Sequence, residues 1–397
     1  MQTKTPTLYI EINNLEYIFF VGKEDANSNI KIIYKCNVPS KGIENDRISD
    51  FELALNTIKK NIYLAEKELN FIFKETIVII NKFNHSFINL SGFKKLNGSQ
   101  ILKENITYIL NSLKSNINEI EDKKKILHIF NSKFFLDKKE VTNLPIGLYG
   151  EFYSQELSFC LINNNDYKNL KNIFEKCNLK IKKIFLKSFV EGSYISNVYL
   201  KIDTFFKVKI NENDTQIYYF ENDSLKFEQN FNFGSDLIVK DISKVTSLKI
   251  DVVKKIISQN QLNNKTSPDE LIEKNFFENE NFRKIKKKLI FEIAVSRIQE
   301  LAEVIFFKNI NFVKFLKNKN SLFLEINDKN NFKCFDESYR LFFSKNDTDV
   351  KLTDSVKIED LLYSVNKLVH FGWKKEAVPV IQTKKSIIAR FFDTLFG

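Results

Sequence analysis

Alternating apolar and polar positions open the chain and predict a β-hairpin. Leu8, Ile10 and Ile12 occupy every second position before an Asn-Asn pair, and residues 17, 19 and 21 do so after it. A period of two is typical of a strand with one buried face, and asparagine tolerates the positive φ of a tight turn. Because a third alternating run covers residues 30–38, we expect a three-stranded meander.

A helix and a further strand are predicted after the meander. Residues 49–52 (SDFE) have the spacing of an N-terminal capping box, and Ile58, Ile62 and Ala65 then share one helical face. Residues 76–80 form a continuous apolar run, which is typical of a buried strand. The predicted order is therefore strand, strand, strand, helix, strand.

The same order of elements returns in the second half of the chain. Strand patterns occur at residues 206–210, 217–220 and 225–233, and they precede helical patterns over 236–258 and a strand at 321–326. Two copies of a three-strand meander, each followed by a crossover helix and another strand, favour the two-lobed α/β architecture of actin and Hsp70. The repeated order is not accompanied by a sequence repeat.

Residues 84–164 separate the two copies and predict an inserted small α/β domain. This block contains a helical pattern near 102–113 and strand patterns at 126–130 and 157–162. Farther along, apolar positions predict a long amphipathic helix over residues 282–307 and another over 358–370.

The last fourteen residues carry the most strongly segregated pattern in the chain. Periodicity is lost over residues 374–383, which indicates a linker, and residues 384–397 then form an amphipathic helix on a helical wheel. Its apolar half contains Ile387, Ile388, Phe391, Phe392, Leu395 and Phe396, and its basic residues are Lys384, Lys385 and Arg390. We expect these residues to bind a membrane surface, with the basic side chains at anionic headgroups.

This terminal helix is too short to span a bilayer. Full burial of one large apolar side chain contributes about 1.5–3 kcal/mol, and ordering a marginal helix consumes part of that gain. A single copy should therefore bind lipid weakly and reversibly. The alternative is that the helix packs on the body of its own chain, which its terminal position and the preceding linker disfavour.

Composition restricts the chemistry that the chain can perform. The 397 residues include 61 Lys+Arg and 50 Asp+Glu, and 43% are hydrophobic, which is enough for two or three cores. There are only ten glycines, and no two stand within two residues of each other, so neither a G-x-G nor a P-loop signature occurs. A vigorous nucleotide-hydrolysing enzyme is therefore disfavoured.

Cysteines and histidines do not indicate a metal site. The four cysteines include no C-x-x-C pair, and the three histidines are far apart in the sequence. We expect His128 and His370 to be packed structural residues. Because neither a signal-peptide pattern nor a run of eighteen apolar residues occurs, we expect a cytoplasmic protein with reduced thiols.

Short motifs spread in order along nearly the whole chain match one known family. They are residues 9–14 (YIEINN), 39–43 (PSKGI), 126–129 (ILHI), 145–150 (PIGLYG) and 368–372 (LVHFG). With these motifs and its terminal amphipathic helix, the chain resembles the FtsA family of actin-like bacterial cell-division proteins. The motifs between 126 and 150 are the most specific, because they lie in the inserted domain that distinguishes FtsA from other actin-like proteins.

The resemblance implies the fold class and the division into subdomains. The expected fold is α/β, a two-lobed actin/Hsp70-like (ribonuclease H-like) ATPase fold with an FtsA-type inserted subdomain. The expected parts are subdomain 1A (1–83 and 165–200), inserted subdomain 1C (84–164), subdomain 2A (201–243 and 320–373), subdomain 2B (244–319), a linker (374–383) and a membrane-targeting helix (384–397).

The resemblance also implies ATP and Mg²⁺ as cofactors, held at the family's nucleotide positions. The matching residues are Glu11, Asn14, Asp214, Thr215 and Gly234. Two departures are marked: residues 209–215 (KINENDT) replace the family's D-I-G-G-G-T, and residues 324–327 (LEIN) replace its L-T-G-G. Side chains at the former glycine positions would obstruct the approach of the backbone to a nucleotide, and Glu212 and Glu325 would repel a triphosphate. The resemblance with these departures predicts a degenerate fold without catalytic turnover.

Partners follow from the same resemblance. Arg297 and Glu300, in residues 296–300 (SRIQE), look like the family's P-R-x-x-E helix near its FtsZ-binding subdomain, with a solvated helix face as the alternative. The implied protein lies on the cytoplasmic face of the inner membrane at the division site. It binds the C-terminal peptide of FtsZ and anionic lipids, self-associates into actin-like filaments, and recruits later division proteins through residues 84–164.

Three other functions stay open. An active actin-fold ATPase or kinase is opposed by the missing glycines. A nucleic-acid-binding protein is suggested by the formal charge of +11, but no aromatic and basic module of recognised spacing is present. A PilM-like pilus-assembly adaptor of the same fold is opposed by the motifs of the inserted domain and by the terminal helix.

Overall fold

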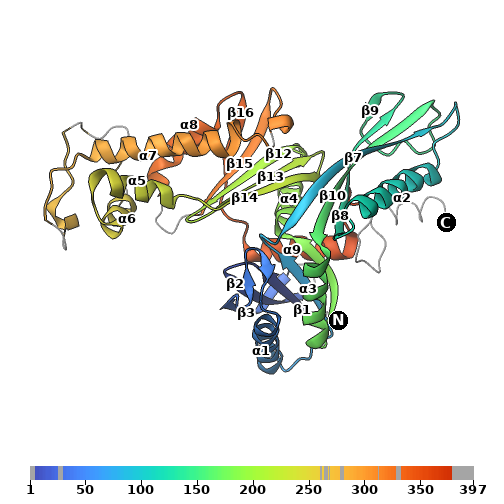
Figure 1. Cartoon of the computed structure of the whole chain (residues 1–397), viewed down its shortest axis with the longest axis horizontal. Helices are drawn as coiled ribbons and strands as arrows, with labels where there is room; N and C mark the ends of the chain where they lie inside the picture. The colour runs from blue at the N-terminus through green and yellow to red at the C-terminus, as the bar shows by residue number, and fades with distance from the viewer. Residues whose placement is uncertain are drawn as a thin grey trace. The chain divides into compact units, whose positions relative to one another are not determined.

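The computed structural model describes residues 5–25, 30–259, 262, 267, 269–277, 281–311, 313–327 and 332–377 (Figure 1). They fall into two compact units. The first unit contains the described residues up to Asp203, together with Phe220–Lys226 and those from Val356 onward, and the second contains Thr204–Tyr219 and Phe227–Ser355.

The first unit is built on a five-stranded mixed sheet. Strands β1 (Thr7–Ile12), β2 (Glu16–Glu24) and β3 (Ile30–Pro39) form the predicted antiparallel meander. Strands β6 (Glu75–Ile80) and β11 (Lys180–Leu186) extend it in parallel beyond β1, giving the order β11-β6-β1-β2-β3.

Helix α1 (Phe51–Leu69) begins one residue later than the capping-box pattern predicts. Its N-cap is Asp50, whose carboxylate accepts a hydrogen bond from the backbone N–H of Leu53 at 2.9 Å. The predicted apolar face is buried against the sheet. Asn70 ends the helix in the left-handed conformation, with φ at 46°.

Residues 84–164 form a second sheet with its own helix. Strands β7 (His85–Lys95), β10 (Phe152–Asn163), β8 (Lys124–Leu136) and β9 (Lys139–Val141) lie in that order, and α2 (Lys103–Ile120) contacts β7. We call this sheet and helix the inserted block. The sequence pattern missed β7, because most of its side chains are half-buried or exposed.

Three more helices and a short strand pair complete the first unit. They are α3 (Asn164–Lys176), α4 (Lys187–Val198), α9 (Ile358–Phe371), β4 (Ile43–Glu44) and β5 (Arg47–Ile48). Helix α1 packs on α3, and α4 packs on α9 (Figure 1). His128 on β8 is buried, as predicted. His370 is exposed, so the prediction of a packed residue was wrong there, because the buried face of α9 passes through Leu368 and Val369 instead.

The second unit repeats the strand order of the first. The strands of its sheet are β12 (Phe205–Asn211), β13 (Thr215–Glu221), β14 (Ser224–Phe231), β15 (Asn320–Asn327) and β16 (Thr348–Leu352), of which Phe220–Lys226, at the β13–β14 turn, belong to the first unit. Their order is β14-β13-β12-β15-β16, with β15 parallel to both of its neighbours. In both sheets a three-strand meander is therefore extended, beyond its first strand, by two parallel strands that come later in the chain.

Helices of the second unit cover this sheet through one apolar core. They are α5 (Asp236–Thr246), α6 (Ile250–Ser258), α7 (Lys287–Ala302) and α8 (Asp336–Phe343), with short turns η1 (Lys274–Phe277), η2 (Glu303–Phe307), η3 (Val313–Phe315) and η4 (Phe332–Phe335). The helical pattern over 236–258 is broken at Ser247, whose φ is 55°. The helix predicted over 282–307 starts only at Lys287 and ends in the π-helical turn η2.

Left-handed turns in the described residues are built mostly without glycine. Thirteen non-glycine residues have positive φ, against four glycines, and most of the thirteen are asparagine or aspartate. In the β13–β14 turn, for example, Asn222 and Asp223 have φ values of 49° and 63°. Short polar side chains reduce the cost of this conformation by bonding locally to the backbone.

Among the described residues, no helix combines the length and the apolar character that crossing a membrane requires. The predicted membrane-binding helix, residues 384–397, lies outside the described residues, as do residues 378–383 of the predicted linker. Residues 374–377 are described and pair with β8.

Candidate functional site

The carboxyl ends of three parallel strands come together at one edge of the first sheet. Glu11 lies on β1, Asn81 follows β6, and Lys187 follows β11. The carboxylate of Glu11 is 2% exposed, and its Oε1 lies 2.8 Å from Nζ of Lys187 and 3.5 Å from Nδ2 of Asn81. Glu11, predicted as a cofactor residue, is thus already paired with an ammonium group in a buried position.

The β1–β2 turn beside Glu11 is closed by side-chain hydrogen bonds. The side-chain oxygen of Asn13 accepts from the backbone N–H groups of residues 15 and 16 at 2.8 and 2.9 Å. The amide of Asn14 donates to the carboxylate of Asp46, and its carbonyl accepts from the hydroxyl of Ser40 at 2.5 Å. This Asx-type turn needs no glycine, and it engages the side chain of the predicted residue Asn14.

In the second unit, the predicted residues Asp214, Thr215 and Gly234 lie together. The backbone N–H of Asn211 donates to the carbonyl of Asp214 at 2.9 Å, and their side chains form a second bond at 2.8 Å. The hydroxyl of Thr215 donates to the carbonyl of Phe233 at 2.9 Å. The β12–β13 turn is thereby fixed to the loop that contains Gly234.

Gly234 permits a very close backbone approach to this turn. A Cβ at this position would lie 2.0 Å from the carbonyl oxygen of Asn211 and 2.7 Å from that of Glu212. The next two N–H groups, of Ser235 and Asp236, donate to these same carbonyls at 2.9 Å each. The N–H groups at the start of α5 are therefore used within the chain and are not free for a phosphate.

A buried ion cluster joins the central strands of the second sheet. Glu325 on β15 is 1% exposed, and its carboxylate oxygens lie 2.7 Å from Nζ of Lys207 and 3.7 Å from Nζ of Lys209 on β12. Burial opposes ionisation of this carboxyl, but the two ammonium groups outweigh it and lower the pKa of Glu325 to about 2. The carboxylate that departs from the family pattern is thus neutralised by lysines.

The residues at the family's nucleotide positions fit a Mg²⁺-bound triphosphate poorly. Glu11 holds an ammonium group where a cation would need a free carboxylate, and the N–H groups at Ser235 and Asp236 are already bonded. Glu212 adds negative charge, paired with Lys254 at 2.8 Å. In the described part of the chain, no group of three or more His, Cys, Asp or Glu residues could hold a metal ion.

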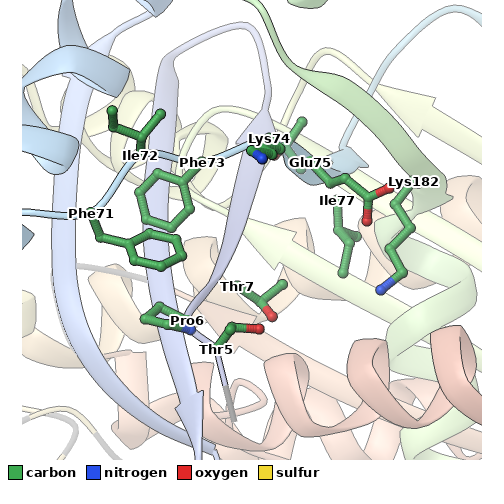
Figure 2. A pocket seen from close by; sticks show the side chains of 11 residues that line it. Thr5, Pro6, Thr7, Phe71, Ile72, Phe73, Lys74, Glu75, Ile77 and Lys182 are labelled. Atoms are coloured by element: carbon green, nitrogen blue, oxygen red, sulfur yellow. The ribbon is translucent and has the colours of Figure 1, made fainter.

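A cavity of about 370 Å³ lies at the opposite edge of the first sheet. Figure 2 shows its lining at the beginnings of β1 and β6, in the loop before β6 and at Lys182 of β11. Phe71 and Phe73 pack edge to face there, with ring centres 5.0 Å apart. Because Glu11 and Lys187 lie at the other ends of these strands, the cavity is separate from the predicted cofactor residues. Sequence reasoning missed it, since its loop has no periodicity.

The predicted partner-binding residues lie together on α7. Nη1 of Arg297 lies 2.7 Å from a carboxylate oxygen of Glu300, and the guanidinium also pairs with Asp241 on α5. The hydrogen bond to Asp241 raises the pKa of Arg297. Arg297 therefore ties α7 to α5, a contact that the sequence did not reveal, while the side chain of Glu300 remains 57% exposed.

Sequence reasoning also missed a buried cluster around Glu376. This carboxylate is 0% exposed, and its oxygens lie 2.9 Å from Nδ1 of His128 and 2.9 Å from Nζ of Lys183. Burial opposes its ionisation, but Lys183 and His128 outweigh this and lower the pKa of Glu376 to about 2. The partners are 248 and 193 positions away along the chain, so no local pattern could reveal them.

Comparison with known proteins finds sequence similarity to cell division proteins named FtsA. No protein-family model matches the chain. It is 22% identical over 301 residues to the cell division protein FtsA of Buchnera aphidicola subsp. Schizaphis graminum, which covers 75% of this chain and 71% of that protein. FtsA of Neisseria meningitidis serogroup B is 21% identical over 298 residues, 75% of this chain and 72% of its own length. For FtsA of Escherichia coli K12 the match covers 44% of this chain and 41% of that protein.

Among solved structures, a PilM–PilN type IV pilus biogenesis complex matches with a TM-score of 0.50. The match covers 91% of this chain and 95% of that chain at 8% identity, and at this identity it supports a common fold alone. The two sheets of equal strand order and the inserted block agree with the predicted fold class, which is confirmed. The chain is therefore a divergent sequence relative of the FtsA cell-division proteins, built on the actin-like ATPase fold.

Proposed function

We propose that this protein is an FtsA-like adaptor that joins FtsZ filaments to the inner face of the cytoplasmic membrane at the division site. The observation that carries the proposal is the similarity to FtsA proteins, which extends over 75% of the chain. The predicted amphipathic helix at residues 384–397 supplies lipid affinity. The same similarity supports self-association into actin-like filaments and recruitment of later division proteins by the inserted block.

In this proposal the adaptor works without nucleotide turnover. The ion pair between Glu11 and Lys187 and the internal bonds of the β12–β13 turn support this part of it. An active actin-fold ATPase is the alternative, and a rise in thermal midpoint with Mg²⁺-ATP would favour it. We expect no such rise, because the buried carboxylate is already neutralised.

The surface of α7 fits an acidic peptide with an apolar anchor, such as the C-terminal peptide of FtsZ. Leu289 is 40% exposed, and the side chain of its neighbour Lys288 is 50% exposed. An amphipathic peptide would bury the leucine and meet the lysine with a carboxylate. Glu300 lies near the C-terminal end of the same helix, and its exposed carboxylate would repel an acidic partner there.

Binding of vesicles tests the membrane part of the proposal. Replacing Phe391 and Phe392 by Asp places two charges on the predicted apolar face and should abolish cosedimentation with anionic liposomes. The matched control, Thr394→Asp, adds a charge on the polar face and should retain most of the binding. Unchanged cosedimentation of the double variant would contradict the anchor.

Localisation of fluorescent fusions in dividing cells tests the proposal as a whole. The full chain should form a band at the division site, whereas a chain without residues 384–397 should be dispersed. A diffuse signal from the full chain, with FtsZ rings intact, would argue against a division adaptor.

A pilus-assembly adaptor is the second candidate, favoured by the likeness of the fold to the PilM–PilN complex. The two candidates differ in the partner that they bind. Measurable affinity for the FtsZ C-terminal peptide, lost when Leu289 is replaced by Asp, would support the first. No affinity for that peptide in the full chain would favour the second.

A further inference from the structure

The chain that follows α9 is held against the inserted block. We call residues 373–377 the strap. The N–H of Asn131 on β8 donates to the carbonyl of Lys375 at 2.7 Å, and the N–H of Ala377 donates to the carbonyl of Ile129 at 2.8 Å. Residues 378–397, which contain the predicted membrane anchor, follow directly. The strap therefore directly precedes the segment that the proposed function assigns to the membrane.

One buried carboxylate of the strap joins two sheets. Each oxygen of Glu376 has its own partner: Oε1 forms a hydrogen bond with His128 on β8 of the inserted block, and Oε2 forms an ion pair with Lys183 on β11 of the first sheet. All three side chains are at most 3% exposed. A carboxylate with two such partners has a defined position, because any displacement leaves a buried ammonium group without its counter-ion.

The histidine of this cluster is held by its surroundings. Its ring packs near those of Phe130 and Phe189, with centres 5.7 and 5.2 Å away. Burial lowers the pKa of His128, so the ring is neutral and its Nδ1–H donates to Glu376. Its Nε2 has no hydrogen-bond partner in the described residues. Within the described residues, the bond to Glu376 is therefore the only hydrogen bond of this side chain.

The start of the strap is anchored separately. Trp373 is 4% exposed, and its Nε1–H donates to the carbonyl of Asp223 at 2.7 Å. Lys374 forms an ion pair with the carboxylate of the same residue. Asp223 belongs to the β13–β14 turn, whose residues from Phe220 to Lys226 are part of the first unit. The strap therefore has an anchor at Asp223 and a second one at Glu376.

We propose that Glu376 is a positioning residue that fixes, on β8 of the inserted block, the point at which the C-terminal segment leaves the protein body. This rests on the proposed function, because the position matters when residues 384–397 bind lipid. Release of the five strap residues would add up to about 18 Å to the reach of the segment, at roughly 3.3–3.6 Å per residue. Glu376 thus sets the distance and the direction of the body relative to its membrane anchor.

Hydrogen exchange at the far end of the strap tests this proposal, because Trp373 at its start is bonded separately to Asp223. In the full-length protein, Glu376→Gln should leave Trp373 shielded from iodide, since the anchor at Asp223 is intact. The amide protons of Ala377 and Asn131 should lose protection from hydrogen exchange, whereas those of β1 should not. Glu359→Gln, an exposed charge removal on α9, is the matched control and should change none of these signals.

A paired substitution separates positioning from stability. Glu376→Gln alone leaves Lys183 buried without a counter-ion, whereas Lys183→Met combined with Glu376→Gln removes both charges and should restore the unfolding midpoint. We expect the amides of Ala377 and Asn131 to stay unprotected in this paired variant. Retained protection of these two amides in either variant would overturn the proposal, because the strap would then be seated without Glu376.

Native-state hydrogen exchange on the unmodified protein decides the question if neither variant folds. The amides of Ala377 and Asn131 should open together in mild denaturant, below the global transition. If they open only with global unfolding, the strap is an inseparable part of the core and the proposal is wrong.

Vesicle binding keeps this proposal distinct from the proposed function. A chain without residues 384–397 should keep the amides of Ala377 and Asn131 protected while it no longer binds anionic liposomes. The paired variant should still bind them, because its predicted anchor is intact. Failure of the full chain to bind would refute the anchor only, and loss of protection at Ala377 and Asn131 in the truncated chain would refute the role of Glu376.

Discussion

Buried carboxylates of this chain are kept ionised by lysines, and this makes stability depend on pH. Glu325 faces Lys207 and Lys209, while Glu376 faces Lys183 and His128. In both cases burial opposes the charge, but the neighbouring lysines, together with the hydrogen bond from His128 at Glu376, outweigh it and give a pKa of about 2 in the folded protein. Burial also lowers the pKa of His128.

We expect the free energy of unfolding to fall by several kcal/mol between about pH 6 and pH 3. The two carboxyls contribute stability that is present above their unfolded pKa of about 4.3 and is lost as the pH falls toward 2. His128 acts in the same direction below its unfolded pKa of about 6.5, because the unfolded chain takes up a proton that the buried ring resists. Urea unfolding across this range measures the effect, and a flat profile would contradict it.

The ion pair of Glu11 leads to a prediction for Lys187. Lys187→Met leaves a buried carboxylate without its ammonium partner, and it should lower the free energy of unfolding by about 3 kcal/mol. Lys201→Met, at an exposed position just beyond α4, is the control and should change it by less than about 0.5 kcal/mol. Denaturant unfolding of both variants checks this. Equal stability would mean that the Glu11–Lys187 pair contributes nothing.

At the level of elements, two glycines allow close packing for different reasons. A Cβ at Gly234 would meet backbone atoms of the β12–β13 turn at 2.0 to 2.9 Å, and these atoms belong to a bonded turn. A Cβ at Gly92 on β7 would meet the side-chain ends of Ile109 and Leu113 on α2, the nearest at 2.4 Å. Backbone is fixed, whereas side-chain ends can rotate.

Gly234→Ala should therefore cost about 3 kcal/mol of stability, and Gly92→Ala about 1 kcal/mol or less. Thermal or chemical unfolding of the two variants gives the comparison. If Gly92→Ala proved the more costly of the two, the packing of α2 on β7 would be tighter than its flexible side chains suggest.

The periodicity of apolar residues predicted most of the helices and strands. The differences from the prediction arise from contacts between residues that are far apart in the sequence. The strands β1, β2, β3, β12 and β15 alternate or run apolar, and all were predicted. The predicted helix over 282–307 starts late because the guanidinium of Arg283 bonds to the carbonyls of Thr246 and Ser247, at 3.2 and 2.8 Å, at the end of α5. Such a bond joins residues 36 and 37 positions apart and leaves no periodic signal.

The candidate site was predictable in position but not in chemistry. The sequence pattern predicted a turn at Asn13 and Asn14, and the structure has Glu11 on β1 just before this turn. Lys187, the ion-pair partner of Glu11, is 176 positions away along the chain, and the fold brings the two residues together. The buried cluster of Glu376 lies in a stretch without periodicity, where the sequence predicted only a linker. Whether the five predicted cofactor residues bind nucleotide stays a prediction.

At the scale of the whole molecule, the two sheets are built in the same order along the chain. Each builds a meander first and adds two parallel strands later, so completion of the first sheet waits for β11. The strap comes later still, after α9, and its Glu376 contacts the buried side chains of Lys183 and His128 in the first unit. Its contribution can be measured by shortening the chain.

A chain ending at residue 377 should have the stability of the full chain, because the strap and its carboxylate remain. A chain ending at residue 372 should lose about 3 kcal/mol or more, since Lys183 and His128 then lack their acidic partner. Unfolding midpoints of the two truncated proteins provide the test. Equal midpoints would show that the strap is dispensable for the fold.

The left-handed turns built on asparagine and aspartate bear on how such a chain can evolve. Glycine codons require guanine at two positions, whereas asparagine codons begin with two adenines. A genome drifting toward adenine and thymine can therefore exchange one residue for the other at turns such as Asn222–Asp223 without losing the fold. Mutational drift would then spare glycine chiefly where a side chain has no room, as at Gly234.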